Sequence, residues 1–345
     1  MALHLITGGS GFVGSNIANL LLKRGEKVRV LDLWKDSNAD PNIKFFIGDI
    51  NDRKLVDSAM LGVDFVHHNV ALVPLSKAGQ DYQTVNVTGT KTALDSAAAA
   101  NVKMFSHMSS SAIFGLPKNM PITNETDRKP IEIYGQAKLD GENLVLAAAE
   151  KGLKVTIIRP RTVIGTGRLG IFQILFEWIA DGSNIYVIGD GNQLFQFVHV
   201  DDLCEVSIRA CINDVPGIYN MGTDQYGTLK DDLSFLCDHS GTGVRVRKLP
   251  VKFAIKMLQL LDKIGLSPLS PWHYLTYHKA YYFDSEPVYE ALNWRPKYSN
   301  RAMLQNSYDE FIKNRNTTAV QKDASAHKKP VKQGILKIIK FLSRV

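Results

Sequence analysis

Cysteine is scarce in this sequence of 345 residues, and its placement excludes two kinds of site. Only Cys204, Cys211 and Cys237 occur, with no CxxC pair and no histidines at metal-ligand spacing. Neither a disulfide framework nor a zinc site is therefore expected. Such cysteine usage is typical of proteins in a reducing compartment, and we expect a cytoplasmic location.

Long apolar runs are also lacking. No segment approaches the ~20 apolar residues that span a bilayer, and Met1 leads almost directly into an apolar strand pattern, so we expect no leader peptide. With 45% hydrophobic and 22% charged residues, the composition predicts a globular protein with a large core.

Acidic residues are nearly absent from the end of the chain. Residues 313–345 contain nine Lys/Arg and one Asp, a net charge of +8, whereas the preceding 312 residues carry −1. Basic residues interleaved with nucleic-acid-binding motifs are not found, so no nucleic acid partner is expected. The pattern instead predicts a linker followed by a basic amphipathic helix over 331–345. Such a helix docks on its own domain, on a partner, or peripherally on an anionic membrane.

The chain opens with a strand, a glycine turn and a helix. An apolar run over 3–7 leads into Gly8-Gly9-Ser10-Gly11-Phe12-Val13-Gly14, and apolar residues then recur at helical spacing. Glycines allow a tight turn and close approach of the backbone to a pyrophosphate, while the helix N-terminus offers free N–H groups. The sequence thus predicts a dinucleotide site.

An acidic residue follows the second strand pattern. Residues 27–31 form an apolar strand that ends at Asp32, where a carboxylate can accept the ribose hydroxyls of an adenosine. Asp32 favours NAD because it repels a 2′-phosphate, and the nearby Lys35 leaves NADP open. The residues predicted to contact the dinucleotide are Gly8, Gly11, Phe12, Val13, Gly14 and Asp32.

A tyrosine and a lysine lie four residues apart in Tyr134-Gly-Gln-Ala-Lys138. On a helix, side chains at this spacing stand on one face, a turn apart. The lysine ammonium favours the phenolate, and so lowers a tyrosine pKa that starts near ~10. The pair is therefore predicted to transfer protons, with Tyr134 as the acid/base.

Strand patterns alternate with helical patterns over the first half of the chain. Strands are expected at about 3–7, 27–32, 43–47, 63–68, 102–108 and 154–159. This order predicts an α/β fold, with a Rossmann-type doubly wound parallel sheet and a smaller C-terminal substrate lobe. We predict a dinucleotide-binding domain over 1–160, completed by later segments, a substrate-binding lobe over 161–312, and the basic tail over 313–345.

Several motifs in order resemble the extended short-chain dehydrogenase/reductase family. They are the glycine loop Thr7–Gly14, Asp49-Ile50, Asn86-Val-Thr-Gly-Thr90, Met108-Ser-Ser-Ser111 and Tyr134–Lys138. The resemblance covers about residues 1–312. The family includes nucleotide-sugar epimerases and dehydratases and the 3β-hydroxysteroid dehydrogenases, so it implies an NAD(P)-dependent epimerase or dehydrogenase and a homodimer.

The resemblance also implies roles for single residues. Asp49 and Ile50 would border the adenine, with capping of the next helix as the alternative for Asp49. Asn86 would help to hold Lys138, which orients the ribose. Ser110 would polarise the reacting oxygen, although the neighbouring Ser109 and Ser111 leave the register open by one residue.

Two departures from the family pattern bear on the substrate. Sugar 4,6-dehydratases carry an Asp-Glu pair after the catalytic hydroxyl, whereas this chain has Ser111-Ala112, which argues against dehydration. Nucleotide-sugar enzymes commonly carry a diphosphate-binding arginine where this chain has Phe195. Arg159, Arg161 and Arg168 are candidates to bind the diphosphate in place of that arginine. The alternative is that these three arginines have structural roles. We name Ser111, Arg159, Arg161 and Phe195 as candidate substrate residues.

Three functions follow from these features. The first is a nucleotide-sugar epimerase or reductase. The alternative is a 3β-hydroxysteroid or other lipid-alcohol dehydrogenase, favoured by Phe195 and by an apolar helix pattern over 251–266, which is a core or lid helix or one that touches a bilayer. A remote third is a non-catalytic dinucleotide-binding redox sensor, which the Tyr134 and Lys138 pair disfavours.

Overall fold

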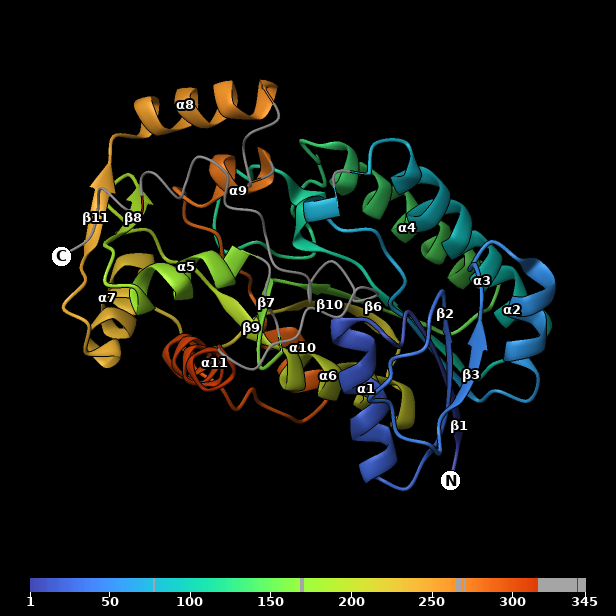
Figure 1. The fold of residues 1–345 in the computed structure, drawn as a ribbon. Coiled ribbons are helices and arrows are strands. Elements are labelled where there is room, and N and C mark those ends of the chain that lie inside the picture. The colour runs from blue at the N-terminus through green and yellow to red at the C-terminus, as the bar shows by residue number, and fades with distance from the viewer. Residues whose placement is uncertain (77, 168–170, 265–268, 270, 316–339, 341–345) are drawn as a thin grey trace.

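The computed structural model describes residues 1–76, 78–167, 171–264, 269, 271–315 and 340. Its centre is a seven-stranded sheet in which every pairing is parallel (Figure 1). In spatial order the strands are β3 (Lys44–Ile47), β2 (Lys27–Asp32), β1 (Leu3–Thr7), β4 (Phe65–His68), β5 (Met104–Met108), β6 (Val155–Pro160) and β10 (Gly217–Met221). The predicted doubly wound fold is confirmed.

Helices cover both faces of this sheet. On one face lie α1 (Phe12–Lys23), α6 (Val200–Ile212) and α10 (Glu286–Ala291), and on the other α2 (Arg53–Met60), α3 (Gly89–Ala99) and α4 (Ile133–Glu150) (Figure 1). The strands β1 and β6 are buried on both faces, and apolar residues predominate in their sequences for that reason. Because all seven strands run parallel, their carboxyl ends lie at one edge of the sheet.

The six expected strands are present within two residues of their predicted bounds. The seventh, β10, was not predicted, because about 55 residues separate it from the end of β6, its neighbour in the sheet. It pairs with β6 over five residues, from Gly217 opposite Thr156 to Met221 opposite Pro160. The sheet is thus completed by a segment from the second half of the chain.

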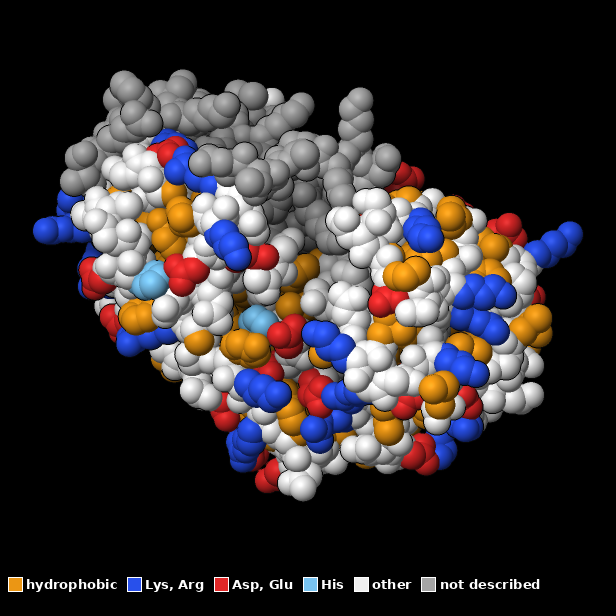
Figure 2. Space-filling model, turned by 60° about the horizontal axis from the view of Figure 1, so that its bottom comes forward, with side chains coloured by type: hydrophobic (Ala, Val, Ile, Leu, Met, Phe, Trp, Pro, Cys, Tyr) orange, Lys and Arg blue, Asp and Glu red, His pale blue; other side chains and the backbone are white. Residues whose placement is uncertain are grey.

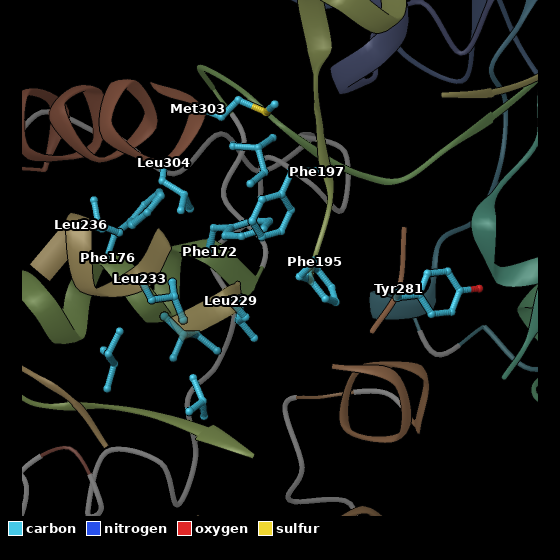
Figure 3. Close-up of a cluster of buried hydrophobic side chains, with 14 of the residues drawn as sticks. Phe172, Phe176, Phe195, Phe197, Leu229, Leu233, Leu236, Tyr281, Met303 and Leu304 are labelled. Carbon is cyan, nitrogen blue, oxygen red and sulfur yellow. The ribbon is translucent and has the colours of Figure 1, made fainter. Parts of the chain in front are cut away.

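The remaining segments form a lobe beside the sheet. It contains α5 (Ile171–Ala180), α7 (Leu229–Ser240), α8 (Val251–Lys263), α9 (Pro271–Thr276) and α11 (Asn300–Asn314), with two short strand pairs, β8 (Ile185–Ile188) with β11 (Val246–Leu249) and β7 (Thr162–Ile164) with β9 (Phe197–His199). Figure 3 shows part of its core, where Phe172 and Phe176 of α5 lie near side chains of α7 and α11. The expected domain division near residue 160 coincides with the end of β6, and stays a prediction.

The helix expected over 251–266 is α8, which ends at Lys263. Ala254, Leu258 and Leu261 are buried, whereas Phe253 and Leu260 are exposed. Among the described helices, none is long and apolar enough to cross a membrane.

Nearly all of the predicted helix over 331–345 lies outside the described residues. Of it only Lys340 is described, and its ammonium lies 2.5 Å from the carboxylate of Asp181. On the face shown in Figure 2, basic and acidic side chains are interspersed, as expected from the near-neutral charge of residues 1–312.

Candidate active site

A cleft of about 410 Å³ opens at the carboxyl edge of the sheet. It is lined by the glycine loop, by the ends of β2, β4, β5 and β6, by the start of α4 and by α9 of the lobe. In doubly wound folds this edge is where ligands bind, because loops from neighbouring strands converge there.

The glycine loop forms one end of the cleft. Gly8 adopts φ = +70°, and its N–H donates to the carbonyl of Leu31 on β2. A Cβ at Gly14 would lie 2.3 Å from the carbonyl oxygen of Gly8, so no other residue fits there. The helix α1 then begins at Phe12 with its N-terminus at the cleft, a geometry that suits a pyrophosphate.

Asp32 lies beside this loop at the end of β2 and lines the cleft. Its carboxylate accepts from the backbone N–H groups of Ser10 at 2.9 Å and Leu33 at 2.7 Å. Burial raises the pKa of Asp32, while these hydrogen bonds act in the opposite direction. The Lys35 ammonium lies 5.3 Å from the ring centroid of Phe45. The residues present therefore fit the adenosine end of a dinucleotide.

Asp49 and Ile50 line the same end of the cleft. Asp49 is exposed and accepts from the backbone N–H of Asn51 at 2.9 Å. The first helical residue of α2 is Arg53, and its N-cap is Asp52 rather than Asp49. The capping role considered for Asp49 therefore belongs to Asp52.

Tyr134 and Lys138 stand on the first two turns of α4, and both line the cleft. The Lys138 ammonium is buried and donates to the carbonyl of Met108 at the end of β5. Burial lowers the pKa of Lys138 to about 8, and the nearby Glu142 carboxylate opposes that effect. Tyr134 packs edge-to-face on Tyr82, with ring centroids 5.9 Å apart.

The three serines after β5 all line the cleft, but they have different partners. Ser109 is buried and donates to Glu142 at 2.6 Å, and Ser111 is buried and accepts from Arg161 at 3.2 Å. Ser110 is half-buried, and its hydroxyl accepts from the N–H of Ala112 at 3.1 Å. Of the three, Ser110 makes no side-chain pair among the described residues and keeps its own proton to donate.

Asn86 lies in a π-helical turn over Gln83–Thr88 and does not line the cleft. Its amide accepts from the N–H of Leu72 at 2.8 Å and donates to the carbonyl of Leu72 at 3.1 Å. Within the described part of the chain, no hydrogen bond joins Asn86 to Lys138. The Asn86 side chain holds the loop on which Leu72 lines the cleft, and its predicted role beside Lys138 stays a prediction.

Arg159 is buried below the cleft and is not among its lining residues. It pairs with Glu142 at 2.6 Å, and Glu142 also accepts from Arg128 at 3.0 Å. Sequence reasoning missed Glu142, although it continues the i, i+4 series from Tyr134 and Lys138 along the buried face of α4.

Arg161 lines the cleft, and Phe195 lies behind it. The guanidinium carbon of Arg161 lies 5.0 Å from the ring centroid of Phe195 and 4.2 Å from that of Tyr281. Figure 3 places Phe195 and Tyr281 at one side of the lobe core. Arg168 lies outside the described residues.

Sequence reasoning named no residue of α9 as part of the predicted substrate site. Trp272, His273 and Tyr277, on and just after α9, line it from the side opposite the sheet. The cluster of aromatic residues over 272–277 was the available signal. Its position over the cleft depends on tertiary structure.

The family model for the NAD dependent epimerase/dehydratase family matches residues 4–222, well over half of the chain. The chain belongs to this family. It is therefore an NAD-dependent enzyme, as the glycine loop, Asp32 and the Tyr134 and Lys138 pair predicted.

Several known proteins resemble the whole chain or its first two thirds. The uncharacterized protein y4nG of Sinorhizobium fredii is 41% identical over 344 residues, which cover 99% of this chain and 86% of that one. The UDP-glucose 4-epimerase of Lactobacillus helveticus is 34% identical over 64% of this chain and 76% of its own. The human sterol-4-alpha-carboxylate 3-dehydrogenase, decarboxylating, is 33% identical over 59% of this chain and 56% of its own.

Solved structures share the fold. The UDP-glucose 4-epimerase of Thermotoga maritima, solved with UDP-glucose, superimposes with a TM-score of 0.75 at 24% identity and covers 90% of this chain and 99% of its own. The dTDP-glucose 4,6-dehydratase of Streptomyces venezuelae, solved with NAD, gives a TM-score of 0.72 at 25% identity over 91% and 98% of the two chains. Both likenesses agree with the fold described above.

Proposed function

We propose that this enzyme acts on a nucleotide sugar as an epimerase or reductase, by NAD-dependent hydride transfer. The observation that carries the proposal is the meeting of Tyr134, Lys138 and Ser110 in one cleft with the glycine loop and Asp32. The 34% identity to a UDP-glucose 4-epimerase supports a sugar as the substrate.

In this proposal the glycine loop holds the pyrophosphate of NAD, Asp32 accepts from the adenosine ribose, and Asp49 and Ile50 border the adenine. When bound, NAD supplies the hydride acceptor and donor. Lys138 donates to the second ribose and keeps a positive charge near the Tyr134 oxygen. Its buried ammonium is already aligned by the Met108 carbonyl, so little reorganisation accompanies binding.

Tyr134 exchanges the proton of the reacting hydroxyl, and Ser110 donates a hydrogen bond to the same oxygen. Epimerisation needs this exchange twice, once in each direction, on one carbon. Dehydration needs an additional acid and base next to the serine, and Ser111 and Ala112 supply neither. The residues therefore favour epimerisation or simple oxidoreduction over elimination.

A lipid-alcohol dehydrogenase is the second candidate. Trp272 and Tyr277 give the cleft an apolar wall, and Phe195 replaces the family's diphosphate-binding arginine. The 33% identity to a human sterol dehydrogenase supports this candidate. On either reading we propose a cytoplasmic enzyme that forms a homodimer, with the basic residues 331–345 making peripheral contact with a membrane.

The test is turnover with purified enzyme on two substrate panels, nucleotide sugars and 3β-hydroxysterols, each with NAD and with NADP. Isomerised sugar without net NADH would establish an epimerase, and net NADH with a sterol would establish the second candidate. The Tyr134→Phe variant is the blank. Turnover in neither panel, with NAD bound, would leave the redox sensor as the remaining hypothesis.

A further inference from the structure

Arg161 is a buried cation that lines the catalytic cleft, and only 2% of it is exposed. It follows Pro160, the last residue of β6, and its N–H donates to the carbonyl of Met221 on β10. Both neighbours belong to paired strands of the sheet, β6 and the edge strand β10. The backbone of Arg161 is therefore fixed by the sheet.

Aromatic rings surround the guanidinium. Its central carbon lies 4.2 Å from the ring centroid of Tyr281, 5.0 Å from that of Phe195 and 5.9 Å from that of Phe283. The Tyr281 hydroxyl in turn donates to the carbonyl of Ser111 at 2.8 Å, which fixes this ring against the active-site loop. Rings stabilise a cation through their faces but accept none of its N–H groups in conventional hydrogen bonds. The donors at the guanidinium edge thus still need acceptors.

The residues that the structure describes supply few of these acceptors. One terminal nitrogen donates to the Ser111 hydroxyl at 3.2 Å, and Nε has no partner in the described part of the chain. No carboxylate forms an ion pair with Arg161 among the described residues. Burial lowers the pKa of Arg161 to about 10, so it stays protonated at neutral pH.

Arg159 provides an internal comparison. It lies two residues earlier, is equally buried, and is neutralised by Glu142 at 2.6 Å. Among the described residues, the arginine below the cleft is thus paired with a carboxylate, whereas the arginine in the cleft is not. A buried charge without a counterion is costly, and its placement at a ligand site indicates that the ligand brings the counterion.

We infer that Arg161 binds a carboxylate which the substrate carries close to its reacting carbon. This inference rests on the proposed function and deepens it. The Ser111 that Arg161 contacts follows Ser110, and β5 and β6 are neighbours in the sheet. Asp32, in contrast, marks the adenosine end of the cleft. A guanidinium edge matches the two oxygens of a carboxylate.

The test compares carboxylated and neutral members of matched pairs. The pairs are UDP-glucuronate with UDP-glucose, and a 3β-hydroxysterol bearing a 4-carboxylate with the same sterol lacking it. Binding to the enzyme–NAD complex is measured by calorimetry, and kcat/KM by turnover. For wild type we expect roughly a 100-fold preference for the carboxylated member of one pair.

The Arg161→Met variant should bring the two members of that pair to within about threefold of each other in affinity and in kcat/KM. Methionine fits the aromatic cage without a charge, so its thermal midpoint should rise rather than fall. Arg161→Lys should recover part of the preference. Arg245→Met, on the exposed surface of the lobe, is the matched control and should change nothing.

Three outcomes would overturn the inference. Wild type shows no preference within either pair. Arg161→Met weakens the binding of UDP-glucuronate and of UDP-glucose equally, which would make the arginine a diphosphate ligand. Arg161→Met lowers the midpoint and leaves the preference intact, which would make it structural.

A further experiment distinguishes failure of the proposed function from failure of the inference about Arg161. If neither panel is turned over, D-glucuronate and D-glucose are compared as thermal-shift ligands of the enzyme–NAD complex. Stabilisation of wild type by glucuronate alone, lost in Arg161→Met, supports the inference without turnover. Equal responses to both sugars contradict it.

Discussion

Single residues of α4 combine in the proposed proton transfer. Lys138 is buried beside the Met108 carbonyl, and its pKa is lowered to about 8, so it is still mostly protonated at neutral pH. A cation at this point favours the Tyr134 phenolate. The two residues therefore depend on each other for function rather than for folding.

Tyr134→Phe should lower turnover by about 10²–10⁴-fold, because the acid/base oxygen is lost. NAD binding and the unfolding midpoint should stay near those of wild type, since the ring still packs on Tyr82. Calorimetric titration with NAD, thermal unfolding and turnover together check this. Activity near wild type would remove Tyr134 from the mechanism.

Glu132 is a second residue with a strongly perturbed environment. It precedes α4 as the N-cap residue without a capping hydrogen bond, and burial raises its pKa from 4.5 to about 7. The folded state then holds this proton more tightly than the unfolded state does. Stability should fall as pH rises from about 4.5 to about 7, by up to about 3 kcal/mol.

Glu132→Gln should remove that contribution. Urea unfolding at pH 4.5 and pH 8 would measure it, with the variant losing less free energy of unfolding between the two pH values than wild type. An identical pH dependence in the two proteins would mean that another group is responsible.

At the scale of elements, α4 is attached to the sheet by a buried ion network. Glu142 accepts from Ser109 of the β5 loop, from Arg159 of β6 and from Arg128. The network positions the strand ends from which Ser110 and Arg161 project. It thus couples the geometry of the site to the packing of one helix.

Glu142→Gln should destabilise the protein by about 3–5 kcal/mol, because Arg159 would be left as an uncompensated buried charge. Asp214→Asn, which breaks the exposed pair with Lys154, is the control and should cost at most about 1 kcal/mol. Denaturant unfolding compares the two. Equal small effects would show that the buried network is not a determinant of stability.

The glycine loop makes a second prediction at this scale. Gly14→Ala places a methyl group 2.3 Å from the carbonyl oxygen of Gly8, which is a backbone atom and cannot simply turn aside. NAD affinity should fall by at least about tenfold, since the loop can no longer approach the pyrophosphate. Ser15→Ala, at the next position on α1, should bind NAD normally. Calorimetric titration of both variants with NAD would test this prediction.

At the scale of the whole molecule, α3 and α4 present small and apolar residues at a shallow surface cavity. Ala98, Leu144 and Ala147 line it. The family resemblance implies a homodimer through two helices beside the active site, and we predict that these are α3 and α4. A homodimer through α3 and α4 would cover this surface and hold the two catalytic clefts in one assembly.

Light scattering after gel filtration should therefore give twice the mass of the chain. Replacement of both Ala98 and Ala147 by arginine should yield a monomer that still binds NAD, because neither residue lines the cleft. Ser58→Arg on α2 is the control and should stay dimeric. A monomeric wild type would refute the interface.

Local features of the sequence were enough to predict the glycine loop, the strand that ends at Asp32 and the Tyr134 and Lys138 pair. Each depends on periodicity or on spacing within a single element, which short-range sterics dictate. The doubly wound sheet followed from their order.

Tertiary structure alone decided which side chains Arg159 and Arg161 contact. Their spacing suggests a common face of one strand, but β6 ends at Pro160, so Arg159 meets Glu142 and Arg161 meets Tyr281. The strand β10, the partners of the three serines and the position of α9 over the cleft were likewise out of reach of sequence patterns. All depend on contacts between segments far apart in the chain, whose packing no local pattern encodes.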